Sequence, residues 1–226
     1  MFSYVFMKIL EGRPRSYEKI MNKASSGKVL KIKQSVAALV PEGARVLEIG
    51  CGTGELAVMC LARGADVDGF DLNPAMIQVA KERIASGGLE SKFSVRQMGV
   101  DGMDGFAEAA YDTVLATLVF SELSDDERHY ALKHAFRVLK AGGRTVIADE
   151  VVPGTFAKKM LHALVRAPMM VTTFLVSGHT TRPVADLAGE LTAAGFTLEK
   201  DERSHGDAFA LVVGIKKENR QVSASL

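Results

Sequence analysis

The chain has little cysteine, almost no excess charge and no long hydrophobic run. Its 226 residues contain two cysteines, Cys51 and Cys60, which are too few for a disulfide framework and favour a reduced, cytoplasmic setting. Lys and Arg total 28 against 27 Asp and Glu, so the sequence lacks the basic footprint of a nucleic-acid-binding protein. No stretch reaches the roughly 18 uncharged apolar residues that a membrane span needs. The apolar opening 2–10 lacks a basic start and a cleavage site, so we expect no signal peptide.

Strand-like runs alternate with helix-like runs through the middle of the chain. This alternation predicts parallel crossovers and a doubly wound α/β sheet. The last two strands are joined by a short connection, which predicts that the final one runs antiparallel. Strands are expected at 44–49, 66–71, 93–98, 113–118, 144–149, 196–202 and 208–216, with helices at 55–63, 74–86, 124–139 and 184–194.

Helix boundaries are signalled by capping residues. Asn73 before Pro74 is typical of a helix start, and Ser124 with Glu127 three positions later forms a capping-box pattern. The pair 142–143, both glycine, is expected to stop the helix that Ser124 begins. On that charged helix, His129 and His134 are expected to face solvent.

A glycine-rich turn follows the first predicted strand, in the sequence Val46-Leu47-Glu48-Ile49-Gly50-Cys51-Gly52-Thr53-Gly54. The glycines allow a tight turn and leave no Cβ in the way of a ligand, and the helix behind them offers unpaired N–H groups. The spacing is G-x-G-x-G, whereas the dinucleotide fingerprint G-x-G-x-x-G is tuned to a pyrophosphate. Glu48 stands two positions before the loop, where a carboxylate suits a cationic ligand.

Asp71 ends the second predicted strand, in Gly69-Phe70-Asp71-Leu72-Asn73. A carboxylate in that place can accept hydrogen bonds from both hydroxyls of a ribose. The residue therefore predicts a nucleoside ligand, but it does not choose between the cofactors that contain a ribose.

Four segments together resemble the successive motifs of class I S-adenosylmethionine (SAM) dependent methyltransferases. They are 46–54, 69–73, 111–112 and 137–143, within a match from about 43 to 149. The nearest branch is that of the ubiquinone/menaquinone C-methyltransferases. A weaker resemblance, carried by 7–17 and by Thr180-Thr181-Arg182, is to methyltransferases associated with corrinoid proteins. The resemblance implies a Rossmann-like seven-stranded sheet in the order 3-2-1-4-5-7-6, with strand 7 antiparallel and helices on both faces.

The resemblance also implies one methyltransferase domain over 1–226. An N-terminal helical segment, 1–40, and a helical insertion, 155–180, are expected to form a cap over the active site. The insertion is apolar, contains methionine and is interrupted by Pro168, which suits an adaptable pocket wall.

By the same resemblance the cofactor is SAM and its product is S-adenosylhomocysteine (SAH). Glu48 and the glycine loop wrap the methionine and ribose part, Asp71 takes the ribose, and Leu72 and Met76 pack near the adenine. The register at the adenine edge is open between Val100 and Asp101, and Asp101 is the preferred choice. The implied cofactor residues are Tyr17, Glu48, Gly50, Cys51, Gly52, Gly54, Asp71, Leu72, Met76, Val100, Asp101, Ala116 and Thr117.

The methyl acceptor is expected to be small or amphipathic: quinone-like, another small molecule, or a group carried by a corrinoid-protein partner. No residue can be assigned as a general base, and no His/Cys/Asp cluster has metal-ligand spacing. Ser121 and Glu122 can also be read as loop residues ahead of Ser124. The candidate acceptor contacts are Ser121, Glu122, Glu150, His162 and His179.

Two other function classes stay open. One is a nucleotide-dependent oxidoreductase on the same fold, which the loop spacing disfavours. The other is a SAM-binding module that acts through a partner without turnover. DNA amino-methylation is disfavoured because the fourth strand ends in Leu118-Val119-Phe120-Ser121, with no N-P-P-Y type tetrad. Lys158, Lys159 and Arg166 beside apolar residues keep contact with a membrane surface as a minority option.

Overall fold

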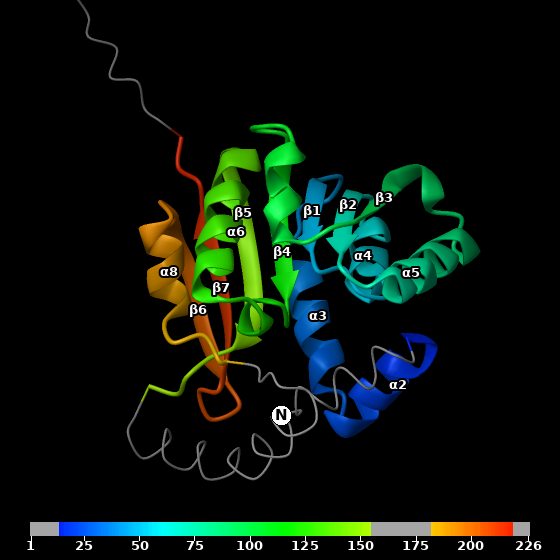
Figure 1. The fold of residues 1–226 in the computed structure, drawn as a ribbon, viewed down its shortest axis with the longest axis horizontal. Helices are drawn as coiled ribbons and strands as arrows, with labels where there is room; N and C mark the ends of the chain where they lie inside the picture. Colours follow the sequence, from blue (N-terminus) through cyan, green and yellow to red (C-terminus); the bar gives the residue numbers. More distant parts are fainter. Residues whose placement is uncertain (1–13, 155–181, 219–226) are drawn as a thin grey trace, which may run out of the picture.

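The structure, a computed structural model, describes residues 14–154 and 182–218. Its centre is one seven-stranded sheet in the order β3-β2-β1-β4-β5-β7-β6 (Figure 1). The strands are β1 Arg45–Ile49, β2 Asp66–Asp71, β3 Phe93–Gln97, β4 Tyr111–Thr117, β5 Leu139–Glu150, β6 Thr197–Ser204 and β7 Phe209–Ile215. The helices are α2 Pro14–Ala24, α3 Lys28–Ala38, α4 Glu55–Leu61, α5 Pro74–Ser86, α6 Asp125–Val138 and α8 Leu187–Ala193, with the 3-10 turns η1 Glu90–Lys92, η2 Val100–Gly105 and η3 Phe120–Glu122.

The sheet combines parallel and antiparallel strands, as predicted. The strands β3, β2, β1, β4 and β5 are parallel, and β7 runs antiparallel to both β5 and β6. This confirms the strand order and the antiparallel seventh strand. The carboxyl ends of β1, β2 and β4 consequently meet at one edge of the sheet, where ligands bind on open α/β folds.

Alternating side chains divide the core into a layer on each face of the sheet. In β4, Leu115 packs with residues of α3 and α4, whereas Val114 and Ala116 pack with residues of α6 and α8. All three are almost fully buried. Near-continuous apolar strands are what a sheet covered on both faces requires.

Both predicted helix starts are confirmed. The Asn73 Oδ1 accepts hydrogen bonds from the N–H groups of Ala75 and Met76 at the start of α5. Ser124 and Glu127 form the reciprocal capping box at the start of α6. The short polar side chains thus satisfy N–H groups that the helix itself cannot.

The helix that Ser124 begins ends within one residue of the predicted 139, but the glycine pair 142–143, which was expected to stop it, lies inside β5. The helix stops at Val138, and Leu139 is already extended, with φ −71° and ψ 139°. Leu139 is fully buried and pairs with Tyr111 of β4, so tertiary packing starts β5 before the two glycines are reached.

The last helix begins later than predicted, at Leu187. Asp186 caps it by accepting from the N–H of Gly189, and the predicted start, Val184, instead forms a parallel bridge with Val151. The segment 184–194, which was predicted to be one helix, therefore contains a β-bridge residue, Val184, followed by the helix α8.

The expectation for His134 is wrong, whereas His129 is exposed as expected. The His134 side chain is only 9% exposed and its ring stacks on Tyr130, with ring centroids 4.2 Å apart. Desolvation by burial, with the cation of Arg137 adding to it, lowers the pKa of His134. The helix turns this face toward η2, which periodicity within one helix did not indicate.

The N-terminal segment is helical over its described part, where α2 contacts both α3 and α5. The predicted insertion 155–180, with its candidates His162 and His179, lies outside the described residues. Within the described ranges, no helix combines the length and the apolar character needed to cross a membrane.

Candidate active site

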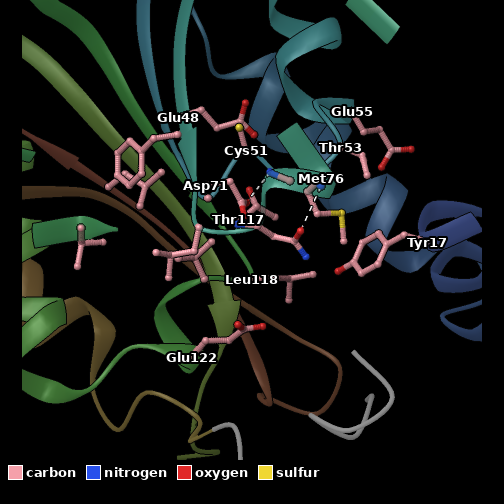
Figure 2. Close-up of a pocket in the computed structure, with 18 of the residues that line it drawn as sticks. Tyr17, Glu48, Cys51, Thr53, Glu55, Asp71, Met76, Thr117, Leu118 and Glu122 are labelled. Carbon is pink, nitrogen blue, oxygen red and sulfur yellow. Dashed lines mark hydrogen bonds between the residues drawn. The ribbon is translucent and has the colours of Figure 1, made fainter. Parts of the chain in front are cut away.

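A cavity of about 710 Å³ opens at the carboxyl ends of β1, β2 and β4, and α2 and α3 form its opposite side. Figure 2 shows Glu48, Asp71 and Thr117 on the strand side of this pocket and Tyr17 facing them from α2. Gly54 and Ala116 lie outside the lining. The pocket brings together the other sequence-predicted cofactor residues, namely Tyr17, Glu48, Gly50, Cys51, Gly52, Asp71, Leu72, Met76, Val100, Asp101 and Thr117.

The three loop glycines serve three different purposes. Each has a positive φ, between 51° and 73°, which side chains tolerate poorly. A Cβ on Gly50 would lie 2.3 Å from a methyl group of Val119, and one on Gly54 would lie 3.0 Å from the Cβ of Ala80 in α5. A Cβ on Gly52 would meet no atom within 4 Å. Gly50 and Gly54 therefore permit close packing, while Gly52 keeps open space at the pocket free.

Asp71 ties the glycine loop to the next strand. Its Oδ2 accepts a hydrogen bond from the N–H of Gly52 at 2.8 Å, and its Oδ1 accepts one from the N–H of Asn73 at 2.8 Å. A carboxylate has about four lone-pair sites, so two remain for a ligand. The residue can hold the loop and bind ribose hydroxyls at once.

Glu48 is the most distinctive group of the pocket. Its side chain is only 4% exposed and its Oε2 has no hydrogen-bond partner among the described residues. Desolvation by burial raises the pKa of Glu48 to about 8, against the lowering effect of Lys33 and with a smaller contribution from Asp71. A buried acceptor left unpaired is costly unless a ligand completes it. The site therefore fits a ligand that brings a cationic donor, as the ammonium group of SAM does.

Two further polar atoms without a partner border the same cavity, Asn22 Oδ1 from α2 and Thr117 Oγ1 from the end of β4. Within the described part of the chain, the only other buried side-chain N or O atom without a hydrogen-bond partner is Thr113 Oγ1. Unsatisfied buried polar groups are rare in proteins, so their gathering around one cavity marks it as a binding site for a polar molecule.

Glu18 joins α2 to the glycine loop. Its carboxylate accepts a hydrogen bond from the hydroxyl of Thr53 and pairs with both terminal nitrogens of Arg83 in α5. Sequence reasoning missed Glu18, because no local pattern indicates that α2 crosses this edge of the sheet.

Lys33 of α3 is a second lining residue that sequence reasoning missed. Its Nζ lies 2.8 Å from Glu55 Oε2, and both side chains are largely buried, at 15% and 14% exposure. Among the described lining residues Lys33 is the sole cation. The carboxylates that line the pocket are Glu18, Glu48, Glu55, Asp71, Asp101, Glu122 and Glu127. Their excess over Lys33 favours a cationic ligand over a phosphate-bearing one.

The pocket lining also contains the residues expected near an adenine. Leu72 is 71% exposed, an unusual state for a leucine, and Met76, which is buried, lines the same pocket. Val100 and Asp101 both line the pocket at the start of η2, Val100 being buried and Asp101 exposed. An exposed acid can accept from an exocyclic amine, while a buried valine offers backbone and an apolar surface. The choice of Asp101 stays a prediction.

Cys51 lies in the loop as a buried free thiol. Desolvation by burial, followed by the charges of Glu48 and Asp71, raises its pKa. The thiol form is therefore favoured, which argues against Cys51 as a nucleophile.

Of the three predicted acceptor contacts within the described residues, one lines the pocket. Glu122 lines the pocket, in the lower part of Figure 2, whereas Ser121 and Glu150 lie outside its lining. Ser121 is buried, with its side chain hydrogen-bonded to Asp149. The turn η3 thus points one of the two neighbouring residues outward and the other inward.

Asp149 near the end of β5 was not singled out from the sequence. It is fully buried and accepts hydrogen bonds from the N–H groups of Phe120 at 2.6 Å and Glu150 at 2.7 Å. Desolvation by burial raises its pKa, against the lowering effect of these hydrogen bonds and of Ser121. Asp149 consequently fixes η3, the turn that carries Glu122.

Leu118, directly before η3, has an unusual backbone. Its φ is 60°, the left-handed region that side chains other than glycine rarely adopt, and its N–H donates to Ala148. The side chain lines the pocket and packs against Met21 and Val29. Such strain is typical of sites that must place a side chain, and here it sends a leucine toward α2 and α3.

No three His, Cys, Asp or Glu side chains gather closely enough to hold a metal ion within residues 14–154 and 182–218. The polar groups that line the pocket are carboxylates, the ammonium group of Lys33, hydroxyls and backbone groups. These groups suit binding and orientation of a polar cofactor.

Sequence comparison matches residues 46–143 to a family described as a methyltransferase domain. The chain is 37% identical over 119 residues to the methyltransferase GfsG of Streptomyces halstedii, covering 51% of this chain and 41% of that protein. It is 33% identical over 138 residues to a demethylmenaquinone methyltransferase of Thermus thermophilus, covering 59% of this chain and 60% of that protein. It is 32% identical over 143 residues to a phosphatidylethanolamine N-methyltransferase of Cereibacter sphaeroides, covering 62% of this chain and 68% of that protein. The chain thus matches about half of the length of the first two relatives.

Structural comparison agrees on the fold. A SAM-dependent methyltransferase of Methanosarcina mazei superimposes with a TM-score of 0.61 at 19% identity, covering 80% of this chain and 96% of that one. The cyclase SpnF superimposes with a TM-score of 0.65 at 18% identity, covering 83% and 81%. At these identities the likeness concerns the fold alone.

Proposed function

Because this chain belongs to the class I SAM-dependent methyltransferases, we propose that it transfers the methyl group of SAM to a small or amphipathic acceptor. The observation that carries the proposal is Glu48, a buried carboxylate whose Oε2 lacks a partner at the edge of a pocket built by the glycine loop. An ammonium group is the ligand that such an atom lacks.

The residues of the chain act by binding and orientation. SAM supplies an activated methyl group on a sulfonium, so the protein needs no strong acid or nucleophile of its own. Glu48 would hold the ammonium, and Asp71 has lone pairs left for the ribose hydroxyls. Holding the acceptor in line with the methyl group and excluding water can lower the barrier by several kcal/mol, roughly 7–11 for well-aligned groups.

The acceptor side of the pocket combines apolar and acidic groups. Met21, Val29, Leu118 and Leu123 supply apolar surface, and Glu122 is the acid beside them. This composition suits an acceptor with an apolar body and a nucleophilic atom that is neutral or bears a proton. A quinone-like ring, an amine, or a group presented by a corrinoid protein all meet this description.

Two anchors in the described residues support a role for segment 155–180 next to the acceptor. The chain leaves the sheet after the Val151–Val184 bridge, and on its return the N–H of Arg182 donates to the carbonyl oxygen of Ser121. Arg182, which follows the segment, therefore lies beside η3, the turn that carries Glu122. We include in the proposal that it covers the acceptor. The two free cysteines fit the proposed cytoplasmic setting.

The proposal is tested with SAM labelled in its methyl group. Purified protein is incubated with labelled SAM and a panel of reduced quinones, phenols, primary amines and a methyl-accepting corrinoid protein. Label in one acceptor with equimolar SAH supports methyl transfer. Failure of the whole panel, with intact SAM binding, contradicts the proposed acceptor classes.

A second candidate is a SAM-binding protein that does not transfer methyl groups. It is kept because SpnF, whose name is that of a cyclase, shares this fold. The two functions differ in one product: only methyl transfer forms SAH in step with a methylated acceptor.

A further inference from the structure

The amino-acid end of SAM carries two charges, an ammonium and a carboxylate, and SAH carries the same pair. The carboxylate of Glu48 can pair only with the positively charged ammonium group. A carboxylate placed in a pocket lined by acids needs a cation beside it, or its binding is opposed by repulsion. The described lining contains one such cation, Lys33.

Lys33 lies at the same end of the pocket as Glu48. It is the second-largest influence on the pKa of Glu48, which it lowers, so the two charges are close in space. Its partner Glu55 is the first residue of α4 and directly follows Gly54, the last glycine of the loop. In Figure 2, Glu48 and Glu55 both lie in the upper part of the view and Glu122 lies in the lower part.

Lys33 has donors to spare. Its ammonium group has three N–H donors, and Glu55 Oε2, at 2.8 Å, accepts one of them. The described residues supply it with no other hydrogen-bond or ion-pair partner. The ion pair also restrains a long side chain that would otherwise lose rotamer freedom when it binds a ligand. Glu55 thus holds Lys33 in place without using up its donors.

We propose that Lys33, held by Glu55, binds the carboxylate of SAM and SAH while Glu48 binds their ammonium group. The pocket then recognises the amino-acid end of the cofactor as a zwitterion. This inference rests on the proposed function, because it takes SAM as the ligand of the pocket. It assigns to α3 a part in cofactor selection.

The simpler interpretation is that Lys33 and Glu55 form only a structural ion pair between α3 and α4. Exposed ion pairs contribute little to stability, but this pair is largely buried and borders a cavity. The two interpretations differ in what they predict for ligands. If the ion pair is only structural, replacing Lys33 affects ligands with and without a carboxylate equally. If Lys33 binds the ligand's carboxylate, the replacement weakens only ligands that carry it.

The test uses ligands that differ at that group alone. Decarboxylated SAM keeps the sulfonium and the ammonium group but lacks the carboxylate, and 5′-methylthioadenosine lacks the whole amino-acid end. Dissociation constants of SAM, SAH and both analogues are measured by calorimetry with the wild type, with Lys33→Met and with Lys33→Arg. Lys31→Met serves as the matched control, since Lys31 is exposed on the same helix and does not line the pocket.

The proposal predicts that the wild type binds decarboxylated SAM about ten- to a hundredfold more weakly than SAM, as expected for one charge-assisted contact. Lys33→Met weakens SAM and SAH by a similar factor and leaves methylthioadenosine, which lacks both charged groups, unchanged within about twofold. Lys33→Arg keeps most of the affinity for SAH, and Lys31→Met keeps all of it.

Equal losses for all four ligands in Lys33→Met, or no loss for any, would overturn the proposal. Equal affinity of the wild type for SAM and decarboxylated SAM would overturn it as well, and this comparison needs no variant to fold. A wild type that binds neither SAM nor SAH contradicts the proposed function itself, so the two failures are distinguishable.

Discussion

The N–H of Gly52 donates a hydrogen bond to Asp71 Oδ2 over 2.8 Å, so the glycine loop after β1 and the acid at the end of β2 form one unit. The sequence separates these residues by 19 positions, but parallel pairing of β1 with β2 brings their ends together. Because Asp71 holds the glycine loop by this hydrogen bond, the loop keeps its conformation before a ligand binds. Preorganisation of this kind saves the free energy of ordering the loop during binding.

Replacing Asp71 with alanine should therefore weaken SAM binding in two ways. It removes the acceptor for ribose hydroxyls, and it releases Gly52 and Asn73 from their side-chain partner. We expect a loss of about 1.5–3 kcal/mol for each charge-assisted contact with the ligand, measured by calorimetry. Asp71→Asn is the control, since its carbonyl oxygen can keep one of the two backbone contacts. Unchanged affinity in a folded Asp71→Ala protein would contradict the assignment.

Gly52 and Gly50 should respond differently to substitution. Gly52→Val places a branched side chain in open space at the pocket, so we expect SAM binding to disappear while the fold survives, at a backbone cost of about 1–2 kcal/mol. Gly50→Ala meets Val119 at 2.3 Å and should lower stability further, by about 1–3 kcal/mol beyond its backbone cost. Denaturant unfolding and SAM titration of both variants separate these effects. Normal SAM binding by Gly52→Val would show that the loop is not the cofactor cradle.

SAM binding should release a proton from Glu48. The pKa of Glu48 is about 8 without ligand, so the carboxyl is mostly protonated at neutral pH, while a cationic ligand favours the ionised form. Affinity should rise by up to about tenfold per pH unit below pH 8 and level off above it. Calorimetry near pH 6.5 in buffers of different ionisation enthalpy should detect about one released proton. Glu48→Gln should bind more weakly and show neither effect. Equal proton release by both proteins would contradict the role of Glu48.

The same group makes the stability of the ligand-free protein depend on pH. The folded pKa of Glu48 lies above its usual value of 4.5, so between 4.5 and about 8 the folded state binds more protons than the unfolded state. Its contribution to stability is thus complete below pH 4.5 and is lost as pH rises toward 8. We expect the unfolding free energy of the wild type to fall relative to Glu48→Gln across this window. The difference between the two proteins cancels other titrating groups such as Asp149. A difference that stays constant with pH would contradict the raised pKa.

Asp149→Ala should be the most destabilising of the single substitutions considered. It leaves the N–H groups of Phe120 and Glu150 without their buried acceptor, at about 1–3 kcal/mol for each. Because these groups fix η3, the turn that carries Glu122 should loosen with it. Urea unfolding checks the stability, and Glu122→Gln is the control that leaves η3 intact. A loss below about 1 kcal/mol would contradict the role of Asp149.

Much of the fold could be predicted, because the strands and helices of a doubly wound sheet leave strong local patterns. The caps at Asn73 and Ser124 are local too, and both were predicted correctly. Predictions failed where tertiary packing decides the local structure. Leu139 extends early because it pairs with Tyr111, and His134 is buried because α6 faces η2.

The site shows the same division. Glu48, the glycines and Asp71 belong to short motifs, so the sequence indicated them. Lys33, Glu18 and Asp149 act through contacts between segments that lie 22, 65 and 29 positions apart, and no local pattern reports such contacts. The spacing of loop glycines alone also did not distinguish Gly52, which borders open space, from Gly54, which packs against Ala80.

Whether the pocket binds SAM and SAH is decided most directly by a calorimetric titration of the wild type with SAH, set beside the same titration with NAD. We expect one SAH per chain, bound in the pocket that Glu48 and Asp71 line, with binding lost in Gly52→Val and no detectable binding of NAD. Binding of NAD in preference to SAH, or no binding of SAH by the folded wild type, would contradict this expectation.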